Sequence, residues 1–185
     1  MTGLLSDEEI RTLCQGEPPL LHPFVPRQEG KPSYGLGSFG YDLRLGARFL
    51  VPLGGINAIL DPVNFPREHF REMTAERFFE LAPHSQVLAE SVETFHMPED
   101  VMGVCWGKSS YARCGLLVNV TPLEPGWKGK LTIELANLSP LPIRLHVGQG
   151  IAQVVFFRSR RPRRTYGEKE AGGAYQNQPG VTLPQ

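Results

Sequence analysis

The chain has 185 residues, of which 41% are hydrophobic and 21% are charged, values typical of one globular domain with a sizeable core. Its 19 basic residues balance 19 acidic ones, so the overall charge gives no reason to expect binding to nucleic acid or to an anionic membrane. No apolar run approaches the roughly 20 residues that a membrane-spanning helix needs. The cysteines Cys14, Cys105 and Cys114 lie far apart or inside apolar runs, which favours reduced thiols and a cytoplasmic protein.

The N-terminal part predicts one short helix followed by a loop. Ser6 and Glu9 have the spacing of a capping box, and the apolar residues after them share one face of a helix that ends near Gly16. Prolines and glycines then crowd residues 17–38, a pattern typical of extended loop.

The rest of the chain has the rhythm of a β protein. Residues 41–45 and 48–51 alternate apolar and polar side chains as a half-buried strand does, whereas Glu76–Leu81 favours one helical turn. Short strand-like runs then recur, separated by Pro, Gly, Asn or Asp, at 86–96, 101–106, 116–121, 130–136, 142–146 and 151–157. We therefore expect a single all-β (mainly β) domain over 1–185, a sandwich, jelly roll or barrel, with 158–185 as a mobile tail.

Several common kinds of site are missing from the sequence. A zinc-dependent base deaminase needs an H-x-E element followed by P-C-x-x-C, and none of the five histidines has a glutamate two residues later. No two cysteines have the spacing of shared metal ligands, and there is no P-loop or G-x-S-x-G motif. The sequence therefore disfavours metal-ligand chemistry and the common nucleotide-binding folds.

Glu134 is the most informative carboxylate. Alternation in Leu131–Leu135 puts Thr132 and Glu134 on the face opposite the three apolar side chains. A solvated outer face is the usual position of such a glutamate. The alternative is a general base held in a cleft, with its pKa tuned by a neighbour such as Arg113.

Three further segments have both a structural and a functional interpretation. Gly107–Ser110 offers backbone N–H groups, hydroxyls and an ammonium to an anion, although an ordinary polar turn fits the same residues. Glu124–Trp127 predicts a turn whose tryptophan covers a ligand, fills the core, or does both. The basic run Arg158–Arg164 is typical of a solvated strand end, and we expect no nucleic acid there.

Taken together, these motifs resemble those of the dCTP deaminase family, the metal-independent relatives of trimeric dUTPases. The matching segments are GSFGYDLRLG at 37–46, GKSSYARCGL at 107–116, VNVTPLEPGWKGKLTIEL at 118–135, GIAQVVFF at 150–157 and YQNQPGVTLP at 175–184. The resemblance implies a distorted β-barrel or jelly-roll protomer of a homotrimer. It also implies active sites between subunits, with the tail 158–185 closing over the nucleotide.

The resemblance implies a role for each site residue. Glu134 would be the general base that takes a proton from water attacking C4 of cytosine, while Ser109 and Arg113 would position that water and steady the glutamate. The expected substrate-binding residues are Lys108, Ser109, Ser110, Tyr111, Ala112 and Arg113 in the phosphate loop, Glu124 at the deoxyribose, Thr132 and Ile133 at the pyrimidine edge, and Gln153, Tyr166 and Gln178 around the triphosphate.

The implied activity is hydrolytic deamination of dCTP to dUTP and ammonia, which supplies dUTP for dUMP and dTTP synthesis. Magnesium would be held by the triphosphate oxygens, zinc would be absent, and dTTP is a candidate inhibitor. Two positions depart from many relatives: Ala174 replaces a lysine before the tail tyrosine, and Lys108 replaces an arginine, which removes a bidentate donor.

Glu124 leaves other functions open. A dUTPase would use this acid to activate water for attack on phosphorus, and a bifunctional enzyme would form dUMP and pyrophosphate from dCTP. A β-barrel that binds nucleotides without catalysis is a further alternative.

Overall fold

The computed structural model describes residues 3–30, 32–54, 59–169 and 172–185. Its elements in chain order are β1 (Gly3–Leu4), α1 (Asp7–Cys14), β2 (Leu21–His22), β3 (Gly35–Gly37), β4 (Gly40–Pro52), the 3-10 helix η1 (Arg67–His69), β5 (Phe70–Thr74), β6 (Phe78–Leu81), β7 (Gln86–His96), β8 (Val101–Gly107), α2 (Ser109–Ala112), β9 (Leu116–Asn119), β10 (Lys128–Asn137), β11 (Ile143–His146), β12 (Gly150–Arg158) and the 3-10 helix η2 (Tyr166–Glu168). Within these ranges, no helix has the length and apolar character needed to cross a membrane.

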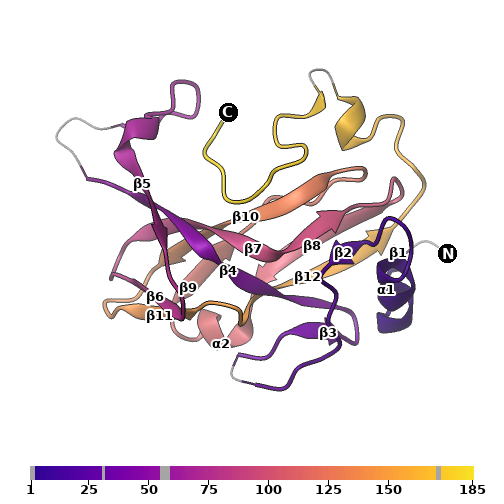
Figure 1. Cartoon of the computed structure of the whole chain (residues 1–185), viewed down its shortest axis with the longest axis horizontal. Coiled ribbons are helices and arrows are strands. Elements are labelled where there is room, and N and C mark those ends of the chain that lie inside the picture. Colours follow the sequence, from indigo (N-terminus) through magenta and orange to yellow (C-terminus); the bar gives the residue numbers. More distant parts are fainter. Residues whose placement is uncertain (1–2, 31, 55–58, 170–171) are drawn as a thin grey trace.

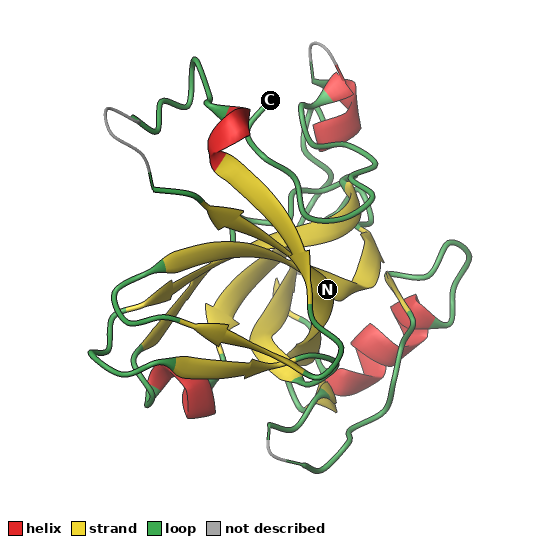
Figure 2. Cartoon of the chain, turned by 60° about the vertical axis from the view of Figure 1, so that its left-hand side comes forward, coloured by secondary structure: helices red, strands yellow, loops and turns green. Residues whose placement is uncertain are grey.

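A curled antiparallel sheet forms the body of the protein (Figures 1 and 2). Its main path runs β1-β12-β4-β7-β10-β9, with β2, β3, β5 and β8 paired to strands of this path, while β6 and β11 form a separate two-stranded sheet. The curl brings the strands around one apolar core, whose fully buried side chains include Leu43, Phe49, Phe95, Ile133 and Phe156. The mainly β fold with a short N-terminal helix is therefore confirmed.

The N-terminal helix forms as its capping signal predicts. The Ser6 N–H donates to Glu9 Oε2 at 3.0 Å, and Glu9 N–H donates to Ser6 Oγ at 3.5 Å, which completes the capping box. Ile10 and Cys14 face the core, and the helix ends two residues before Gly16.

The predicted strands are found, with three local differences. The two segments at 41–45 and 48–51 are parts of one long strand, β4, and the loop 17–38 contains the short strands β2 and β3. The helical turn expected at Glu76–Leu81 is wrong. This segment contains β6, which pairs with β11, and Phe79 stacks on Phe49 with ring centroids 4.5 Å apart.

The C-terminal tail, residues 158–185, returns along β10. Lys130 N–H donates to the Gln178 carbonyl at 2.9 Å, and Asn177 N–H donates to the Lys128 carbonyl at 2.9 Å. Residues 170 and 171 of this tail lie outside the described residues. The tail and α2 lie at opposite ends of the molecule (Figures 1 and 2).

Candidate active site

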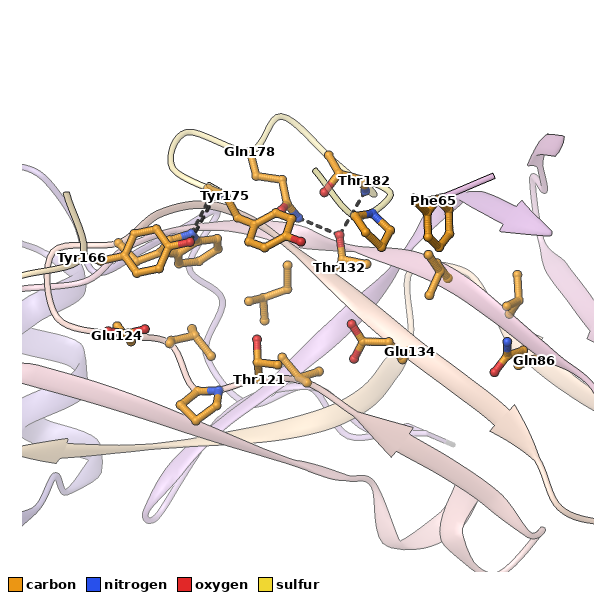
Figure 3. A pocket seen from close by; sticks show the side chains of 18 of the residues that line it. Phe65, Gln86, Thr121, Glu124, Thr132, Glu134, Tyr166, Tyr175, Gln178 and Thr182 are labelled. Atoms are coloured by element: carbon orange, nitrogen blue, oxygen red, sulfur yellow. Dashed lines mark hydrogen bonds between the residues drawn. The ribbon is translucent and has the colours of Figure 1, made fainter. Parts of the chain in front are cut away.

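A cavity of about 770 Å³ lies between β10, the turn that precedes it and the C-terminal tail (Figure 3). Three groups of residues line the cavity around Glu134: Leu131, Thr132 and Glu134 from β10, Thr121, Glu124 and Trp127 from the turn region, and Tyr166, Tyr175, Gln178 and Thr182 from the tail. Beyond Glu134 the cavity continues into an apolar end that includes Phe65, Phe70 and Leu88. Segments far apart in the sequence thus meet around one carboxylate.

Glu134 faces the cavity because of the alternation along β10. Leu131, Ile133 and Leu135 are buried in the core, whereas Glu134 is half-buried on the other face. Asn119 lies directly opposite on β9, and its Nδ2 donates to Glu134 Oε2 at 3.2 Å.

The electrostatic setting of Glu134 favours proton uptake. Burial raises the pKa of this carboxyl above its ordinary value, while its own backbone N–H and the Asn119 amide act in the opposite direction. Burial disfavours the charged form, so the carboxylate in this cavity is a stronger base than one in water. Such a group is suited to proton transfer.

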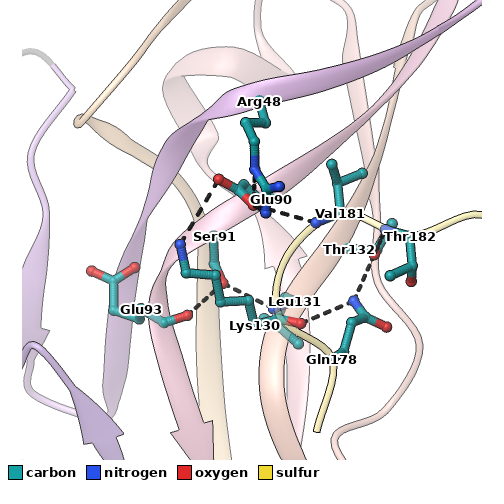
Figure 4. Close-up of polar contacts among 10 residues, drawn as sticks. All are labelled: Arg48, Glu90, Ser91, Glu93, Lys130, Leu131, Thr132, Gln178, Val181 and Thr182. Carbon is teal, nitrogen blue, oxygen red and sulfur yellow. Dashed lines mark hydrogen bonds and ion pairs between the residues drawn. The ribbon is translucent and has the colours of Figure 1, made fainter. Parts of the chain in front are cut away.

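Thr132 joins the active face of β10 to the tail. Its hydroxyl oxygen accepts a hydrogen bond from Gln178 Nε2 at 2.7 Å and another from Thr182 N–H at 3.0 Å (Figures 3 and 4). Gln178 Nε2 also donates to the Lys130 carbonyl at 3.0 Å. In this chain the Gln178 amide therefore fastens the tail to β10 as well as lining the cavity.

The turn before β10 is also tied to the tail. Trp127 is buried and its Nε1 donates to the Tyr175 carbonyl at 2.8 Å, so it both fills the core and supports the tail. The hydroxyl oxygen of Tyr166 accepts from Tyr175 N–H at 3.0 Å. Lys169 Nζ donates to Glu124 Oε1 at 2.6 Å, an ion pair between tail and turn.

An ion-pair cluster around the buried carboxylate of Glu90 holds the end of the tail (Figure 4). The Arg48 guanidinium donates to Glu90 Oε2 at 2.7 Å, and Lys130 Nζ lies 3.8 Å from Glu90 Oε1. Val181 N–H donates to the same Glu90 Oε2 at 3.3 Å. The backbone after Gly180 is therefore hydrogen-bonded to the Glu90 carboxylate, which Arg48 and Lys130 also contact.

The segment 108–113, which the resemblance assigns to phosphate binding, lies outside the lining of the Glu134 cavity. Ser109, Ser110, Ala112 and Arg113 are exposed on or beside α2, and none of them lines the cavity of Glu134. Arg113 Nη1 donates to the Ser109 carbonyl at 3.0 Å. Within one chain Arg113 does not contact Glu134, and Asn119 is the side chain that donates to the glutamate, so the role expected for Arg113 stays a prediction.

The remaining expected site residues have mainly internal contacts. Tyr111 is buried, and its hydroxyl accepts from His146 N–H at 2.9 Å. The Ile133 side chain is in the core, so only its backbone can reach a ligand. Lys108 and Gln153 both contact Asp42, away from the cavity of Glu134.

No metal cluster is found among the described residues, in which no group of three or more His, Cys, Asp or Glu side chains is placed to hold an ion. The three cysteines are free thiols.

Sequence reasoning missed Asn119, Asp42 and Glu90. Asn119 is a polar residue within an apolar run, Glu90 interrupts a strand pattern with a charge, and Asp42 occupies a polar position of an alternating strand. Each signal was visible, but the partner of each residue is set by strand register rather than by sequence spacing.

Comparisons with curated proteins bear on this site. Residues 4–159 match a family model described as dCTP deaminase-like. The chain is 46% identical over 167 residues to a dCTP deaminase of Anaplasma phagocytophilum (strain HZ), with 89% of each chain covered. It is 43% identical over 188 residues to a dCTP deaminase of Helicobacter pylori (strain J99), with 99% of this chain and 98% of that relative covered.

Among solved structures, the fold is similar to that of 2'-deoxycytidine 5'-triphosphate deaminase from Agrobacterium tumefaciens, with a TM-score of 0.67 and 20% sequence identity. The alignment covers 85% of this chain and 48% of that chain, so the present chain spans about half of that protein's length. At this identity the likeness concerns the fold.

Proposed function

This chain belongs to the dCTP deaminase family, and on that premise we propose that it converts dCTP and water into dUTP and ammonia with Glu134 as the general base. The observation that carries the proposal is the setting of Glu134. It is a half-buried carboxylate with a raised pKa, facing a cavity of about 770 Å³, a size suited to a small-molecule ligand.

In the proposed reaction, Glu134 takes a proton from water as the water oxygen bonds to C4 of cytosine. The electron pair of the C4–N3 double bond moves to N3, which receives that proton from Glu134, and C4 becomes tetrahedral. Glu134 then takes the proton of the new hydroxyl and passes it to the amino group. The bond from C4 to the amino nitrogen breaks, ammonia leaves, and a carbonyl forms at C4.

The proposal assigns Ser109 and Arg113 of a second copy of the chain to the attacking water. Support comes from their exposure on or beside α2, which lies at the end of the molecule opposite the tail (Figure 1). These groups therefore meet a Glu134 cavity only on another subunit. A homotrimer with each active site between two subunits satisfies this requirement.

The substrate is Mg–dCTP, in which phosphate oxygens hold the magnesium ion. The hydroxyl of Thr132 and the backbone of Ile133 and Glu134 would face the pyrimidine edge, and Glu124 would face the sugar. Lys108 and Ser110 would bind the phosphates. Tail closure over the nucleotide is supported by the tail residues that line the cavity, Tyr166 and Gln178 among them.

A bifunctional enzyme that also forms dUMP and pyrophosphate is the second candidate. Glu124 lines the same cavity and is the acid that such an enzyme would use. Its Oε1 accepts from Lys169 Nζ at 2.6 Å, however, so one carboxylate oxygen is already engaged by the tail and is less available to an attacking water. This contact favours deamination alone.

Incubation of the purified chain with dCTP and magnesium, followed by separation of the nucleotides and measurement of ammonia, tests the proposal. We expect dUTP and ammonia in equal amounts. Formation of dUMP and pyrophosphate together with ammonia would identify the bifunctional enzyme. Absence of ammonia would rule out deamination.

A further inference from the structure

A buried carboxylate away from the Glu134 cavity gathers three donor side chains. Asp42, on β4, is almost fully buried, and its Oδ2 accepts from Lys108 Nζ at 2.5 Å and from Arg27 Nη1 at 2.6 Å. Its other oxygen, Oδ1, accepts from Gln153 Nε2 at 3.3 Å. Three segments of the chain thus converge on one acid.

The cluster carries more positive charge and more donors than Asp42 can satisfy. Two cations share one carboxylate, and Arg27's other ion-pair partner, Glu29, has a side chain that is 83% exposed and therefore well screened by water. A lysine ammonium has three N–H donors, an arginine five and a glutamine two, so each side chain keeps at least one N–H beyond its contacts here. These unused N–H donors, including those on two cationic side chains, suit a multiply charged anion.

The cluster is open to such an anion. A second cavity of about 620 Å³ is lined by Arg11, Arg27, Gln153, the residues Leu36–Phe39 and one carboxylate, Asp7. Lys108 is not part of this lining and lies behind Arg27, on the same Asp42 oxygen. The Arg27 side chain is 39% exposed, whereas that of Lys108 is 12% exposed. Arg27 is therefore the more accessible of the two cations, and Asp42 fixes its position beside Lys108.

We propose that Arg27 is a further triphosphate-binding residue, held by Asp42 next to Lys108 and Gln153 so that the three side chains grip one polyphosphate. This inference rests on the proposed function for the identity of the nucleotide, but it concerns the affinity for phosphate groups and not the chemistry at C4. A guanidinium is suited to this task because it stays charged and binds phosphate oxygens in pairs. Asp42 is a positioning residue, since it orients both cations.

Arg27 also has a structural contact, because its Nη2 donates to Ser33 Oγ at 2.9 Å and so ties the loop before β3. The test must therefore separate loss of charge from loss of loop order. Arg27→Lys keeps the charge, and Arg27→Gln keeps a donor for Asp42 without the charge. Arg144→Ala is the matched control, because Arg144 is a surface arginine paired with Glu80 on the β6–β11 sheet.

The experiment is calorimetric titration of the full chain with inorganic triphosphate, alongside the KM for Mg–dCTP in the ammonia assay. We expect Arg27→Gln to weaken triphosphate binding and to raise this KM by about tenfold or more, the scale of one lost charge-assisted contact. We expect the kcat of Arg27→Gln to change by less than about twofold. Arg27→Lys should recover most of the triphosphate affinity, because it restores the charge beside Lys108. Arg144→Ala should leave the triphosphate affinity unchanged, because Arg144 is not part of this cluster.

Unchanged triphosphate affinity in Arg27→Gln, or equal losses in the Lys and Gln variants, would overturn the inference. No binding of inorganic triphosphate by the wild-type chain would overturn it as well. If the wild-type chain releases no ammonia from dCTP, the proposed function fails, but the titrations with inorganic triphosphate still decide the role of Arg27.

Discussion

At the scale of single residues, Glu134 and Asn119 face each other across β9 and β10, and the Asn119 amide donates to the carboxylate that we propose as the general base. Glu134→Gln keeps the size and hydrogen-bonding reach of the side chain but cannot take a proton from water. We expect turnover of dCTP to fall about 10²–10⁴-fold, the usual contribution of a general base, with nucleotide affinity retained. Ammonia release and dCTP binding measured on the same preparation check this, and unchanged turnover would refute the role of Glu134.

The same substitution should change stability in a pH-dependent way. Because burial raises the pKa of Glu134, the folded protein holds the proton more tightly than the unfolded chain. This contribution to stability is complete below the ordinary value of 4.5 and is lost as the pH rises through the raised pKa. Glu134→Gln, which has no charge to bury, should therefore melt at a higher temperature than the wild type at pH 7. The difference should disappear below about pH 4.5.

Asn119 is predicted to set the acid limb of the pH–activity profile. Its amide stabilises the charged form of Glu134, so Asn119→Ala should raise the pKa of the carboxyl further. The base must be deprotonated to act, and the acid limb of kcat/KM should therefore move to higher pH. Asn64→Ala, at an exposed loop asparagine, is the control. An acid limb that stays in place would show that Asn119 does not act on Glu134.

At the scale of elements, the tail docks on β10 and β7 through Thr132 and Glu90, and the fit at Gly180 is tight. A Cβ at this position would overlap the Arg48 guanidinium and the Glu90 carboxylate. Gly180→Ala requires the Arg48–Glu90 ion pair to move, and because both clashing atoms end flexible side chains we expect a loss of about 1 kcal/mol of tail docking, the low end of overpacking costs. We expect faster amide hydrogen exchange in residues 175–182 and a higher KM for dCTP.

Gly54→Ala is the control for the tail, because a Cβ at Gly54 meets nothing within 4 Å and Gly54 lies two residues beyond the end of β4, outside the tail. If both variants exchange tail amides at the wild-type rate, the Gly180 contact does not contribute to docking of the tail. Loss of exchange protection throughout the sheet in Gly180→Ala would instead indicate general unfolding.

Elements that bury apolar side chains could be predicted from the sequence, whereas elements that bury few could not. The strands β7 to β12 are short apolar or alternating runs separated by Pro, Gly, Asn or Asp, and this spacing located each of them. The sequence does not predict β5, because its residues are largely exposed and give no apolar pattern. It predicts a helical turn in place of β6, because β6 is short and pairs only with β11. The tail lacks an apolar pattern because backbone groups and amides hold it, as at Gln178 and Trp127.

The candidate site could be predicted only in part for the same reason. The alternation in β10 indicated which face Glu134 takes, and the turn signal located Glu124 and Trp127. The contacts Asn119–Glu134 and Arg27–Asp42 depend on strand register and on a loop that folds back over β4. Neither is encoded in local spacing, so both required the three-dimensional structure.

At the scale of the whole molecule, the two groups of residues that the proposed function assigns to one active site do not meet within a chain. Glu134 faces the cavity under the tail, whereas Arg113 is exposed beside α2 at the opposite end (Figure 1). Under the proposed function, an active site consists of Glu134 from one subunit and Arg113 from the next. Two differently inactivated subunits can then complement each other, which a site formed within a single chain cannot do.

Arg113→Ala and Glu134→Gln should each be inactive as homogeneous proteins but active after mixing, unfolding and refolding together. In a random one-to-one mixture, about a quarter of the interfaces combine an intact Glu134 with an intact Arg113, so about a quarter of wild-type ammonia release should return. Each variant refolded alone is the control for reversion and for incomplete unfolding. If mixed oligomers, verified by mass, recover no ammonia-releasing activity, the whole active site lies in one chain. A conformational change would then have to bring α2 to the cavity of Glu134.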